Sequence, residues 1–462
     1  MGVADLPADP RKACFKAYDI RGRVPDELDP GLAARIGRAF AEQFKLQRVV
    51  MGRDVRLSGP ELARALASGL AAAGARVLDM GLCGTEELYF AVNHLECDGG
   101  VMVTASHNPS DYNGFKLVRQ GARPVSADTG LQEIAQRALA ERRASTPAAA
   151  PEVVQARDAY VLHVLKLLRT RLPAFRLVVN PGNGAAGPLL EKLCARLPFS
   201  VTWMNREPDG HFPNGVPNPL LPENREATAR RVREYGADLG LAWDGDFDRC
   251  FFFDERGEFI EGYYLVGLLA EYFLRRFPGA RIIHDPRLVW NTRDIVERLG
   301  GVAIESKCGH AFIKERMRSE DAVYGGEMSA HHYFRDFFYC DSGMIPWLLV
   351  LELMAESQQP LSALLAERMR RFPVSGEINR AVRDSNAAMK RVENHYAGQG
   401  SVSRVDGLSM DFGAWRFNLR PSNTEALLRL NVESRGDAAL VQACTREILG
   451  LIDTASPQEA GA

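Results

Sequence analysis

The sequence predicts an α/β protein with three related mixed α/β domains and a smaller C-terminal α+β domain. Its 462 residues are too many for one hydrophobic core. Short apolar runs alternate with segments of helical periodicity through most of the chain, as in βαβ units. The last part changes to several strand-like segments followed by one helix, which is typical of an α+β domain.

The first predicted domain, residues 1–150, begins this alternation. Its predicted helices cover residues 32–44, 60–74 and 89–94, and its predicted strands cover residues 48–52, 75–81 and 100–104. Apolar runs that end in glycine or threonine and are followed by helices indicate parallel strands with crossover helices. Residues 142–156, which are rich in Ala and Pro, are predicted to be a linker.

The same pattern recurs in the predicted domains 151–256 and 257–372. The first of them has a strand at 176–180 and then a Gly-rich turn and a helix, and the second has a strand at 280–285 and a helix at 291–299. The fourth domain, 373–462, has predicted strands at 403–410, 414–419 and 426–433 and a helix at 437–451. The apolar run 343–351 is too short to span a membrane and is predicted to be a buried helix.

The composition narrows the possible partners and compartment. Lys and Arg number 57 against 59 Asp and Glu, which gives a net charge of −2. Such a balance offers no overall attraction to nucleic acid or to anionic membranes. The eight cysteines are dispersed, which argues against a zinc site or a disulfide framework and favours a reducing cytoplasm. We therefore expect a cytoplasmic protein without a signal peptide, either a monomer or a weak homo-oligomer.

A serine in a tight polar loop is the strongest local signal. Ser106 follows the apolar run 100–103, and His107, Asn108 and Pro109 come directly after it. A hydroxyl presented at a strand end is typical of phosphoryl or acyl transfer. The structural alternative is a Ser-His-Asn turn that only caps a helix.

Three carboxylates at alternating positions form the second signal. Asp244, Asp246 and Asp248 lie between two apolar runs and would repel one another without a cation. A hard divalent ion, Mg²⁺ above all, would suit them and phosphate chemistry. An EF-hand is disfavoured because Arg249 stands where that loop needs glycine and because the flanks are not helical. A solvated acidic turn is the remaining alternative.

Two further loops combine polar groups in short turns. Residues 325–332 contain Glu327 and Ser329, which can accept hydrogen bonds from and donate them to sugar hydroxyls. Residues 420–425 bring an arginine, two hydroxyls and an amide together, a donor set that suits phosphate. Either segment, taken alone, is equally compatible with a structural turn. The adjacent His331 and His332 do not indicate zinc, because they face opposite ways on a strand.

In this order, these segments resemble the α-D-phosphohexomutase superfamily. The match is to its phosphomannomutase/phosphoglucomutase subgroup, especially bacterial phosphomannomutases of polysaccharide pathways and GDP-mannose synthesis. The motifs that carry it are Thr-Ala-Ser-His-Asn-Pro at 104–109, Asp-Gly-Asp-Phe-Asp-Arg at 244–249, Gly-Glu-Met-Ser at 326–329 and Arg-Pro-Ser-Asn-Thr at 420–424. The sequence departs from the family at Thr85-Glu86, where Thr-Pro is frequent, at Phe247, where glycine is commoner, and at Arg287, where lysine is frequent.

The resemblance implies four domains around a central cleft and a set of site residues. It implies a phosphoserine at Ser106, with Mg²⁺ held by Asp244, Asp246, Asp248 and a phosphoserine oxygen. Glu327 and Ser329 would bind sugar hydroxyls, and the distal phosphate would bind Arg420, Ser422, Asn423 and Thr424. Further candidates are Tyr18, Arg287 and Gly309 for substrate binding, and Arg21, His107, Lys116, Arg249, His310 and His331 for catalysis.

The implied activity is the interconversion of mannose 6-phosphate and mannose 1-phosphate. Phospho-Ser106 would pass its phosphoryl group to the sugar and form a hexose 1,6-bisphosphate, which would also serve as activator. The alternatives are a dual-specificity phosphomannomutase/phosphoglucomutase, a phosphoglucosamine mutase, a metal-dependent phosphatase and a non-catalytic sugar-phosphate sensor. The expected partners are small hexose phosphates.

Overall fold

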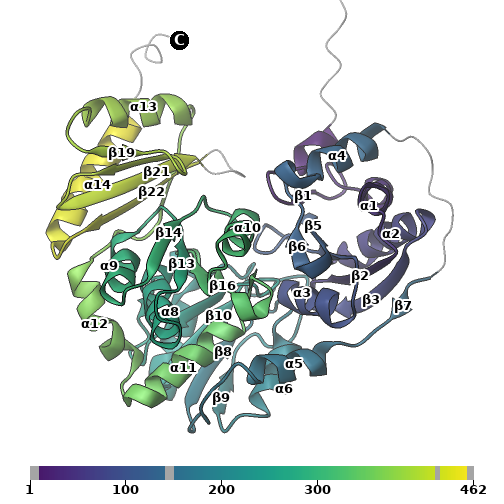
Figure 1. Cartoon of the computed structure of the whole chain (residues 1–462), viewed down its shortest axis with the longest axis horizontal. Helices are drawn as coiled ribbons and strands as arrows, with labels where there is room; N and C mark the ends of the chain where they lie inside the picture. The colour runs from purple at the N-terminus through teal and green to yellow at the C-terminus, as the bar shows by residue number, and fades with distance from the viewer. Residues whose placement is uncertain (1–9, 141–149, 422–426, 455–462) are drawn as a thin grey trace, which may run out of the picture. The chain divides into compact units, whose positions relative to one another are not determined.

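The structure, a computed structural model, describes residues 10–140, 150–421 and 427–454. Figure 1 shows its helices and strands in chain order by colour. The chain divides into two compact units. Unit 1 comprises Met1–Ile260 and His331–Pro360, and unit 2 comprises Glu261–Ala330 and Leu361–Ala462. Short 3-10 helices lie at η1 Pro10–Cys14, η2 Gln120–Ala122, η3 Ala127–Thr129, η4 Pro222–Asn224 and η5 Arg335–Phe337.

The N-terminal part of unit 1 is a mixed sheet in the order β1-β5-β4-β2-β3-β7, with β6 paired to β5. Its strands are β1 Ile20–Arg23, β2 Arg48–Arg53, β3 Arg76–Leu82, β4 Gly99–Val103, β5 Tyr112–Arg119, β6 Arg123–Pro124 and β7 Glu152–Val153. The central strands β4, β2 and β3 are parallel, whereas β5 is antiparallel to β4 and β1. The carboxyl end of β4 therefore leads directly into the serine loop.

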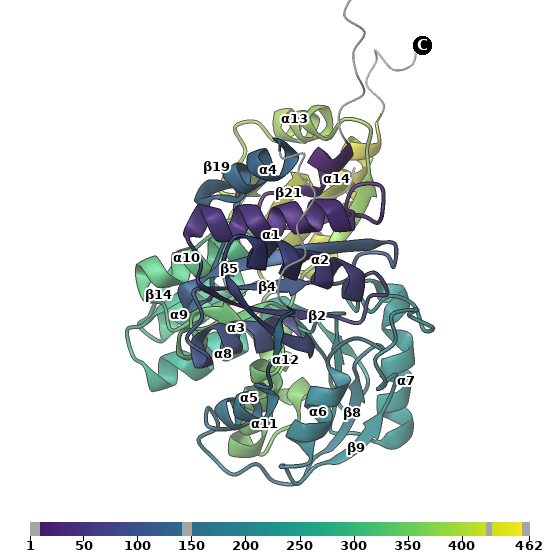
Figure 2. The same cartoon turned by 90° about the vertical axis from the view of Figure 1, so that its right-hand side faces the viewer.

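Helices cover both faces of this sheet (Figure 2). They are α1 Pro30–Phe44, α2 Gly59–Ala72, α3 Thr85–His94 and α4 Leu131–Ala140. Alternate strand residues such as Val49, Val101 and Phe115 join the apolar faces of α1, α2 and α4 in one core, and α3 packs on the opposite face. The Asp29 side chain caps α1 by accepting a hydrogen bond from the Leu32 N–H at 2.7 Å.

The second sheet of unit 1 has the order β12-β11-β10-β8-β9. The elements of this part are β8 Arg176–Asn180, β9 Ser200–Trp203, β10 Leu239–Trp243, β11 Cys250–Phe253, β12 Phe259–Ile260, α5 Arg157–Leu165, α6 Gly187–Cys194 and α7 Glu226–Tyr235. Unit 1 also contains the antiparallel pair β16 His332–Phe334 and β17 Cys340–Asp341, and α11 Ile345–Ser357. Strand β10 is parallel to β8 but antiparallel to β11, so the loop 244–249 is a hairpin connection.

Unit 2 contains one parallel and one antiparallel arrangement of strands. β13 Arg281–His284 pairs in parallel with β14 Val302–Glu305 and β15 Tyr324–Gly326. Around them lie α8 Gly262–Arg276, α9 Trp290–Arg298, α10 His310–Glu320 and α12 Leu361–Arg371. The C-terminal sheet has the order β18-β22-β21-β20-β19, and its elements are β18 Ile378–Ala381, β19 Ser401–Ser403, β20 Leu408–Asp411, β21 Trp415–Pro421, β22 Leu427–Ser434, α13 Ser385–His395 and α14 Ala438–Asp453.

The predicted fold class is confirmed: three mixed α/β parts precede a C-terminal α+β part. Two local predictions differ from the structure. Part of the expected linker forms β7, which pairs with β3, because a two-residue strand carries no readable periodicity. The expected strand 403–410 is two strands, β19 and β20, separated by a turn that ends at Gly407, which has a φ of +72°.

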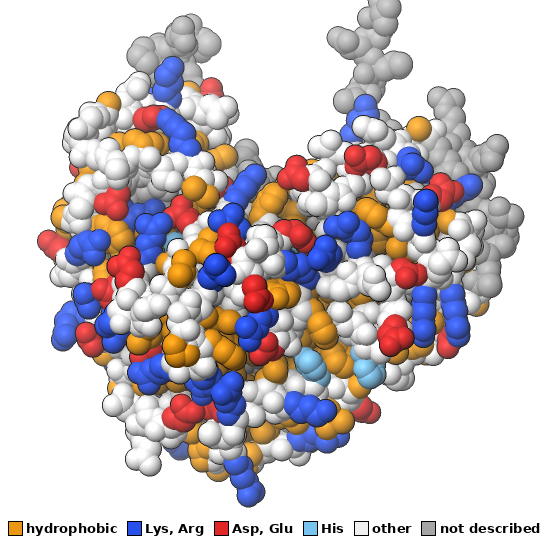
Figure 3. Space-filling model, in the orientation of Figure 1, with side chains coloured by type: hydrophobic (Ala, Val, Ile, Leu, Met, Phe, Trp, Pro, Cys, Tyr) orange, Lys and Arg blue, Asp and Glu red, His pale blue; other side chains and the backbone are white. Residues whose placement is uncertain are grey.

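The surface and the helices agree with the composition. On the face shown in Figure 3, Lys and Arg side chains are scattered among Asp and Glu side chains. All eight cysteines lie in the described residues as free, buried thiols. Across the described part of the chain, none of the helices combines the length and apolar character that crossing a membrane requires.

Candidate active site

The serine loop is held by a buried arginine. Ser106 has a φ of +51°, and its N–H donates to Thr104 Oγ1 at 2.8 Å. Arg56, which is 1% exposed, donates from both Nη atoms to four backbone carbonyls at 2.6 to 2.9 Å, those of Ser106, Asn108, Pro109 and Tyr112. Such charge-assisted hydrogen bonds fix the conformation of the loop before any substrate binds.

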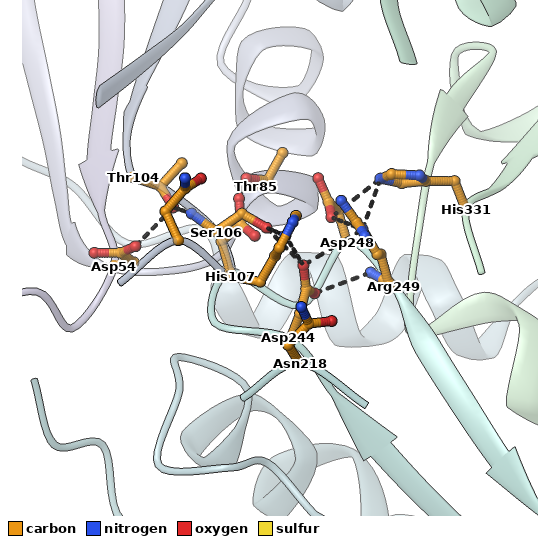
Figure 4. A network of polar contacts seen from close by, with 12 residues as sticks. Asp54, Thr85, Thr104, Ser106, His107, Asn218, Asp244, Asp248, Arg249 and His331 are labelled. Atoms are coloured by element: carbon orange, nitrogen blue, oxygen red, sulfur yellow. Dashed lines mark hydrogen bonds and ion pairs between the residues drawn. The ribbon is translucent and has the colours of Figure 1, made fainter. Parts of the chain in front are cut away.

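A second set of contacts anchors the same loop. Asp54, directly after β2, accepts a hydrogen bond from Thr104 Oγ1 at 2.6 Å (Figure 4). It also accepts one from the Arg56 N–H at 3.0 Å. Arg21 Nη1 donates to Asn108 Oδ1 at 2.8 Å, and Arg21 Nε donates to Asp19. Asp54, Arg56 and Thr104 were not among the predicted site residues.

The aspartate loop lies against the serine loop. Ser106 Oγ donates to Asp244 Oδ2 at 2.7 Å and lies 3.0 Å from His107 Nδ1. A Cβ at Gly245 would lie 2.4 Å from the Ser106 carbonyl oxygen, so glycine permits this approach. The flanks of the loop are the paired strands β10 and β11, which is not the helix–loop–helix arrangement of an EF-hand.

The three aspartates form a site that could hold a metal ion. Oxygens of Asp244, Asp246 and Asp248 lie within 4.8 Å of one another, and each residue is at most 1% exposed. Among the described residues, the Oδ1 atoms of Asp246 and Asp248 are buried and accept no hydrogen bond. An all-oxygen set with unused buried acceptors fits a hard divalent cation such as Mg²⁺.

Lys116, on β5, partly balances this negative charge. Its Nζ donates to Asp246 Oδ2 at 2.7 Å and to Asp248 Oδ2. Burial opposes the charged form, but the attraction of Asp246 and Asp248 prevails and raises the pKa of Lys116 above its usual value. Thr85, the first residue of α3, also donates from Oγ1 to Asp246 Oδ2, at 2.5 Å. Thr85 was not a predicted site residue and was noted only in the pair Thr85-Glu86, where Thr-Pro is frequent in the family.

The pKa values of Asp244 and Asp248 are shifted in opposite directions. Burial, together with the charges of Asp248 and Asp246, raises the pKa of Asp244 to about 7. Burial also opposes the charge on Asp248, but Lys116 and His331 outweigh it and hold the pKa of Asp248 well below its usual value. Arg249 Nε donates to His331 Nε2 at 3.2 Å, and that nitrogen lies 3.5 Å from Asp248 Oδ1. These contacts place Arg249 and His331 at the edge of the aspartate cluster.

Unit 2 holds a separate polar cluster. Arg287 donates to Asp285 Oδ2 at 2.8 Å and to Ser329 Oγ at 3.1 Å, and it lies 3.6 Å from Glu327 Oε1. The Gly309 N–H donates to the same Glu327 oxygen at 3.0 Å. Burial opposes the charge on Arg287, yet Asp285 and the other nearby anions raise its pKa above the usual value.

Each unit thus brings together its own share of the predicted residues. Unit 1 gathers Arg21, Ser106, His107, Lys116, Asp244, Asp246, Asp248, Arg249 and His331, with the half-buried Tyr18 beside Arg21. Unit 2 gathers Arg287, Gly309, Glu327, Ser329 and Arg420, and the buried His310 begins α10 next to Gly309. Ser422, Asn423 and Thr424 lie outside the described residues. Glu377, which contacts Arg287 and Arg420, was not predicted.

Models of known protein families match nearly the whole chain. The four domain models of phosphoglucomutase/phosphomannomutase match residues 12–145 (α/β/α domain I), 158–257 (domain II), 261–372 (domain III) and 377–451 (C-terminal domain). The chain belongs to the phosphoglucomutase/phosphomannomutase family. It is therefore an enzyme, a phosphohexomutase, as the motifs predicted.

Relatives and solved structures of this family agree with the assignment. The chain is 59% identical over 441 residues to the "Phosphohexose mutases" protein of Xanthomonas campestris pv. campestris, covering 95% of this chain and 98% of that one. It is 56% identical over 452 residues to the phosphomannomutase of Escherichia coli K12, covering 95% and 99%. A phosphoglucomutase/phosphomannomutase family protein from Burkholderia thailandensis superposes with a TM-score of 0.85 at 34% identity, covering 96% of this chain and 98% of that one.

Proposed function

We propose that this phosphohexomutase interconverts mannose 6-phosphate and mannose 1-phosphate in the cytoplasm, through a phosphoserine at Ser106. The observation that carries the proposal is the 2.7 Å hydrogen bond from Ser106 Oγ to Asp244, one of the three buried aspartates. A phosphoryl group on that hydroxyl would lie next to the carboxylates, where a cation could neutralise its charge. The relatives named phosphomannomutase, at 55 to 58% identity, support mannose as the sugar.

The first half-reaction transfers the phosphoryl group from Ser106 to the sugar. The bond between Ser106 Oγ and phosphorus breaks, and Ser106 Oγ takes up a proton from an acid. The free hydroxyl of the hexose monophosphate forms a bond to the same phosphorus and passes its proton to a base. His310 and His331 are the candidate bases. Lys116 is a candidate proton donor only, because its raised pKa keeps it protonated. Asp244, Asp246 and Asp248 would hold Mg²⁺, which when bound supplies electrostatic stabilisation of the transferred phosphoryl group.

The second half-reaction restores the enzyme. The hexose 1,6-bisphosphate reverses its orientation, and Ser106 Oγ loses its proton and forms a bond to the phosphorus of the original phosphate. The bond from that phosphorus to the sugar oxygen breaks, and the sugar oxygen takes up a proton. Arg56, Asp54 and Thr104 keep Ser106 in place during both transfers. In this proposal Glu327 and Ser329 bind the sugar hydroxyls, and Arg420 binds the phosphate that is not reacting.

A dual-specificity phosphomannomutase/phosphoglucomutase is the second candidate. The name of the Xanthomonas relative, which refers to phosphohexose mutases and not to one sugar, favours it. Either sugar would use the same serine, aspartates and phosphate ligands. The two candidates differ only in how the hydroxyl at C2 of the sugar is recognised.

The decisive test is a coupled assay with Mg²⁺ and a trace of hexose 1,6-bisphosphate. Mannose 1-phosphate and glucose 1-phosphate are compared at equal concentrations, with the Ser106→Ala variant as control. A preference for mannose of at least about tenfold, which corresponds to about 1.4 kcal/mol, supports the dedicated enzyme. Comparable rates support dual specificity. Turnover of neither sugar, or turnover that persists in Ser106→Ala, contradicts the proposal.

A further inference from the structure

Glu377 sits among three arginines in unit 2. It lies between α12 and β18, and its side chain is 14% exposed. Its Oε2 accepts hydrogen bonds from Arg287 Nη1 and Arg420 Nη2, both at 3.3 Å, and Arg429 Nη1 lies 3.6 Å from its Oε1. A single carboxylate is thus shared by the proposed phosphate ligand Arg420 and by the arginine that contacts Ser329.

Glu377 is one of several carboxylates that compensate the arginines of this cluster, and Asp406 also acts on the charge of Arg420. The guanidinium groups of Arg287, Arg420 and Arg429 are accompanied by the carboxylates of Asp285, Glu327 and Glu377. The arginines outweigh the effect of burial and hold the pKa of Glu377 below its usual value, so it is ionised at neutral pH. Without this carboxylate the three arginines would lose one of the negative charges that compensate them.

In the described part of the chain, the Nε donors of Arg287 and Arg420 have no acceptor. Among the described residues, Arg287 Nε and Arg420 Nε are buried and make no hydrogen bond, although Arg287 is 2% exposed and Arg420 is 5% exposed. Buried donors of this kind are normally satisfied, so they point to an anion that binds here. A phosphate has enough oxygens to accept from both arginines.

The contacts of Glu377 suggest that its charge matters more than its geometry. Arg287 is already held by Asp285, which accepts from its Nη2 at 2.8 Å and from its backbone N–H at 2.9 Å. By contrast, both hydrogen bonds to Glu377 are 3.3 Å long, and charge-assisted bonds are usually about 2.7–2.9 Å. Glu377 is therefore not required to position Arg287, but it lowers the positive potential that a phosphate would meet.

We propose that Glu377 is an internal competitor for the substrate phosphate: the phosphate displaces its carboxylate from Arg420, and Glu377 pairs with Arg420 again when the phosphate leaves. The inference rests on the proposed role of Arg420 as a phosphate ligand. A bisphosphate that must reverse its orientation has to be released from this arginine in every cycle. An internal anion weakens the binding of the phosphate to Arg420. It also pairs with Arg420 while the bisphosphate reverses its orientation.

The test measures binding of two probes, mannose 6-phosphate and inorganic phosphate, to the full-length protein by calorimetry, alongside kcat and KM. In Glu377→Gln the charge is lost while the shape is kept. We expect both Kd values and KM to fall on the order of tenfold, as for the loss of one competing charge in a partly buried pair, with no rise in kcat. A scaffolding role would instead raise Kd and KM.

Matched variants make the outcome specific. Glu377→Ala also removes the charge and replaces Glu377→Gln if that variant unfolds. Glu393→Gln, which breaks the exposed pair with Arg404 in the same unit, should leave both affinities unchanged. Unchanged or weaker binding in both Glu377 variants overturns the inference. In that case, the proposed function still stands if the wild type binds the probes and Arg420→Ala does not. If wild type neither binds nor converts hexose phosphates, the proposed function fails and the inference fails with it.

Discussion

Replacing Arg56 by lysine should separate the placement of the serine loop from its chemistry. Arg56 makes four hydrogen bonds from two Nη atoms, at 2.6 to 2.9 Å, to carbonyls of the loop. A lysine keeps the charge, but it donates from one nitrogen and lacks the planar fork, so about two of the four bonds are lost. A hydrogen bond to a charged group contributes roughly 1.5–3 kcal/mol, and we therefore expect a loss of at least about 3 kcal/mol in the free energy of unfolding.

Thermal unfolding and hydrogen exchange measure this effect directly. A loss of about 3 kcal/mol should lower Tm by roughly 6–12 °C for a unit of ordinary domain size. The amides of the serine loop should exchange faster, because its carbonyls no longer hold the backbone. We expect kcat to fall about 100-fold or more, because a displacement of about 1 Å in the reacting group has that effect.

The control is Arg76→Lys, at the exposed pair with Glu152, which should change the free energy of unfolding by less than about 0.5 kcal/mol. Two results would refute the reasoning. A normal Tm with normal protection of the loop would show that the four hydrogen bonds do not hold it. A clear loss of stability with normal turnover would show that the position of Ser106 does not depend on Arg56.

Four further predictions concern the site itself. Ser106→Ala should reduce turnover by at least about 10⁴-fold with an unchanged Tm, and mass spectrometry should find no phosphate on that loop. Asp246→Asn should weaken Mg²⁺ binding by about 10-fold or more in calorimetry, since it neutralises one ligand. The pKa of Asp244 is raised to about 7 in the folded state, so the stability that it contributes is complete below its unfolded pKa of about 4 and is lost as the pH rises through 7. In EDTA, the Tm should therefore fall as the pH rises over this range. Asp244→Asn should abolish this dependence of Tm on pH. Arg420→Ala should raise KM for 1-phosphates and 6-phosphates alike, by about 10- to 100-fold, and an effect on one of them alone would contradict a shared phosphate site.

The parts of the site that could be predicted are those whose residues lie close together in the sequence. Ser106 and the three aspartates stand in loops that directly follow apolar strands, and a strand followed by a polar loop can be recognised in a single sequence window. The contacts within each loop are short-range. The sequence alone therefore indicated both the proposed nucleophile and the candidate cation site.

The supporting residues could not be found in this way. Arg56 lies 50 positions from Ser106, and Thr85 lies 161 positions from Asp246. A sequence does not distinguish a buried arginine or threonine from an exposed one. Burial at these positions depends on which strands lie next to each other in the folded protein. Glu377 is harder still, since its three arginine partners come from β21, β22 and the segment after β13. The four-domain pattern, by contrast, depends on periodicity, which is local and readable.

Phe247 shows how a departure from a family motif is accommodated. Its φ is +51°, a conformation that glycine adopts freely and that costs a residue with a side chain on the order of 1 kcal/mol or more. The ring is fully buried, which contributes about 1.5–3 kcal/mol and can offset that strain. The ring occupies the space beside Gly84, where a Cβ would lie 2.1 Å from it. Phenylalanine at 247 therefore depends on glycine at 84, and the backbone of the aspartate loop keeps the conformation that a glycine at 247 would allow.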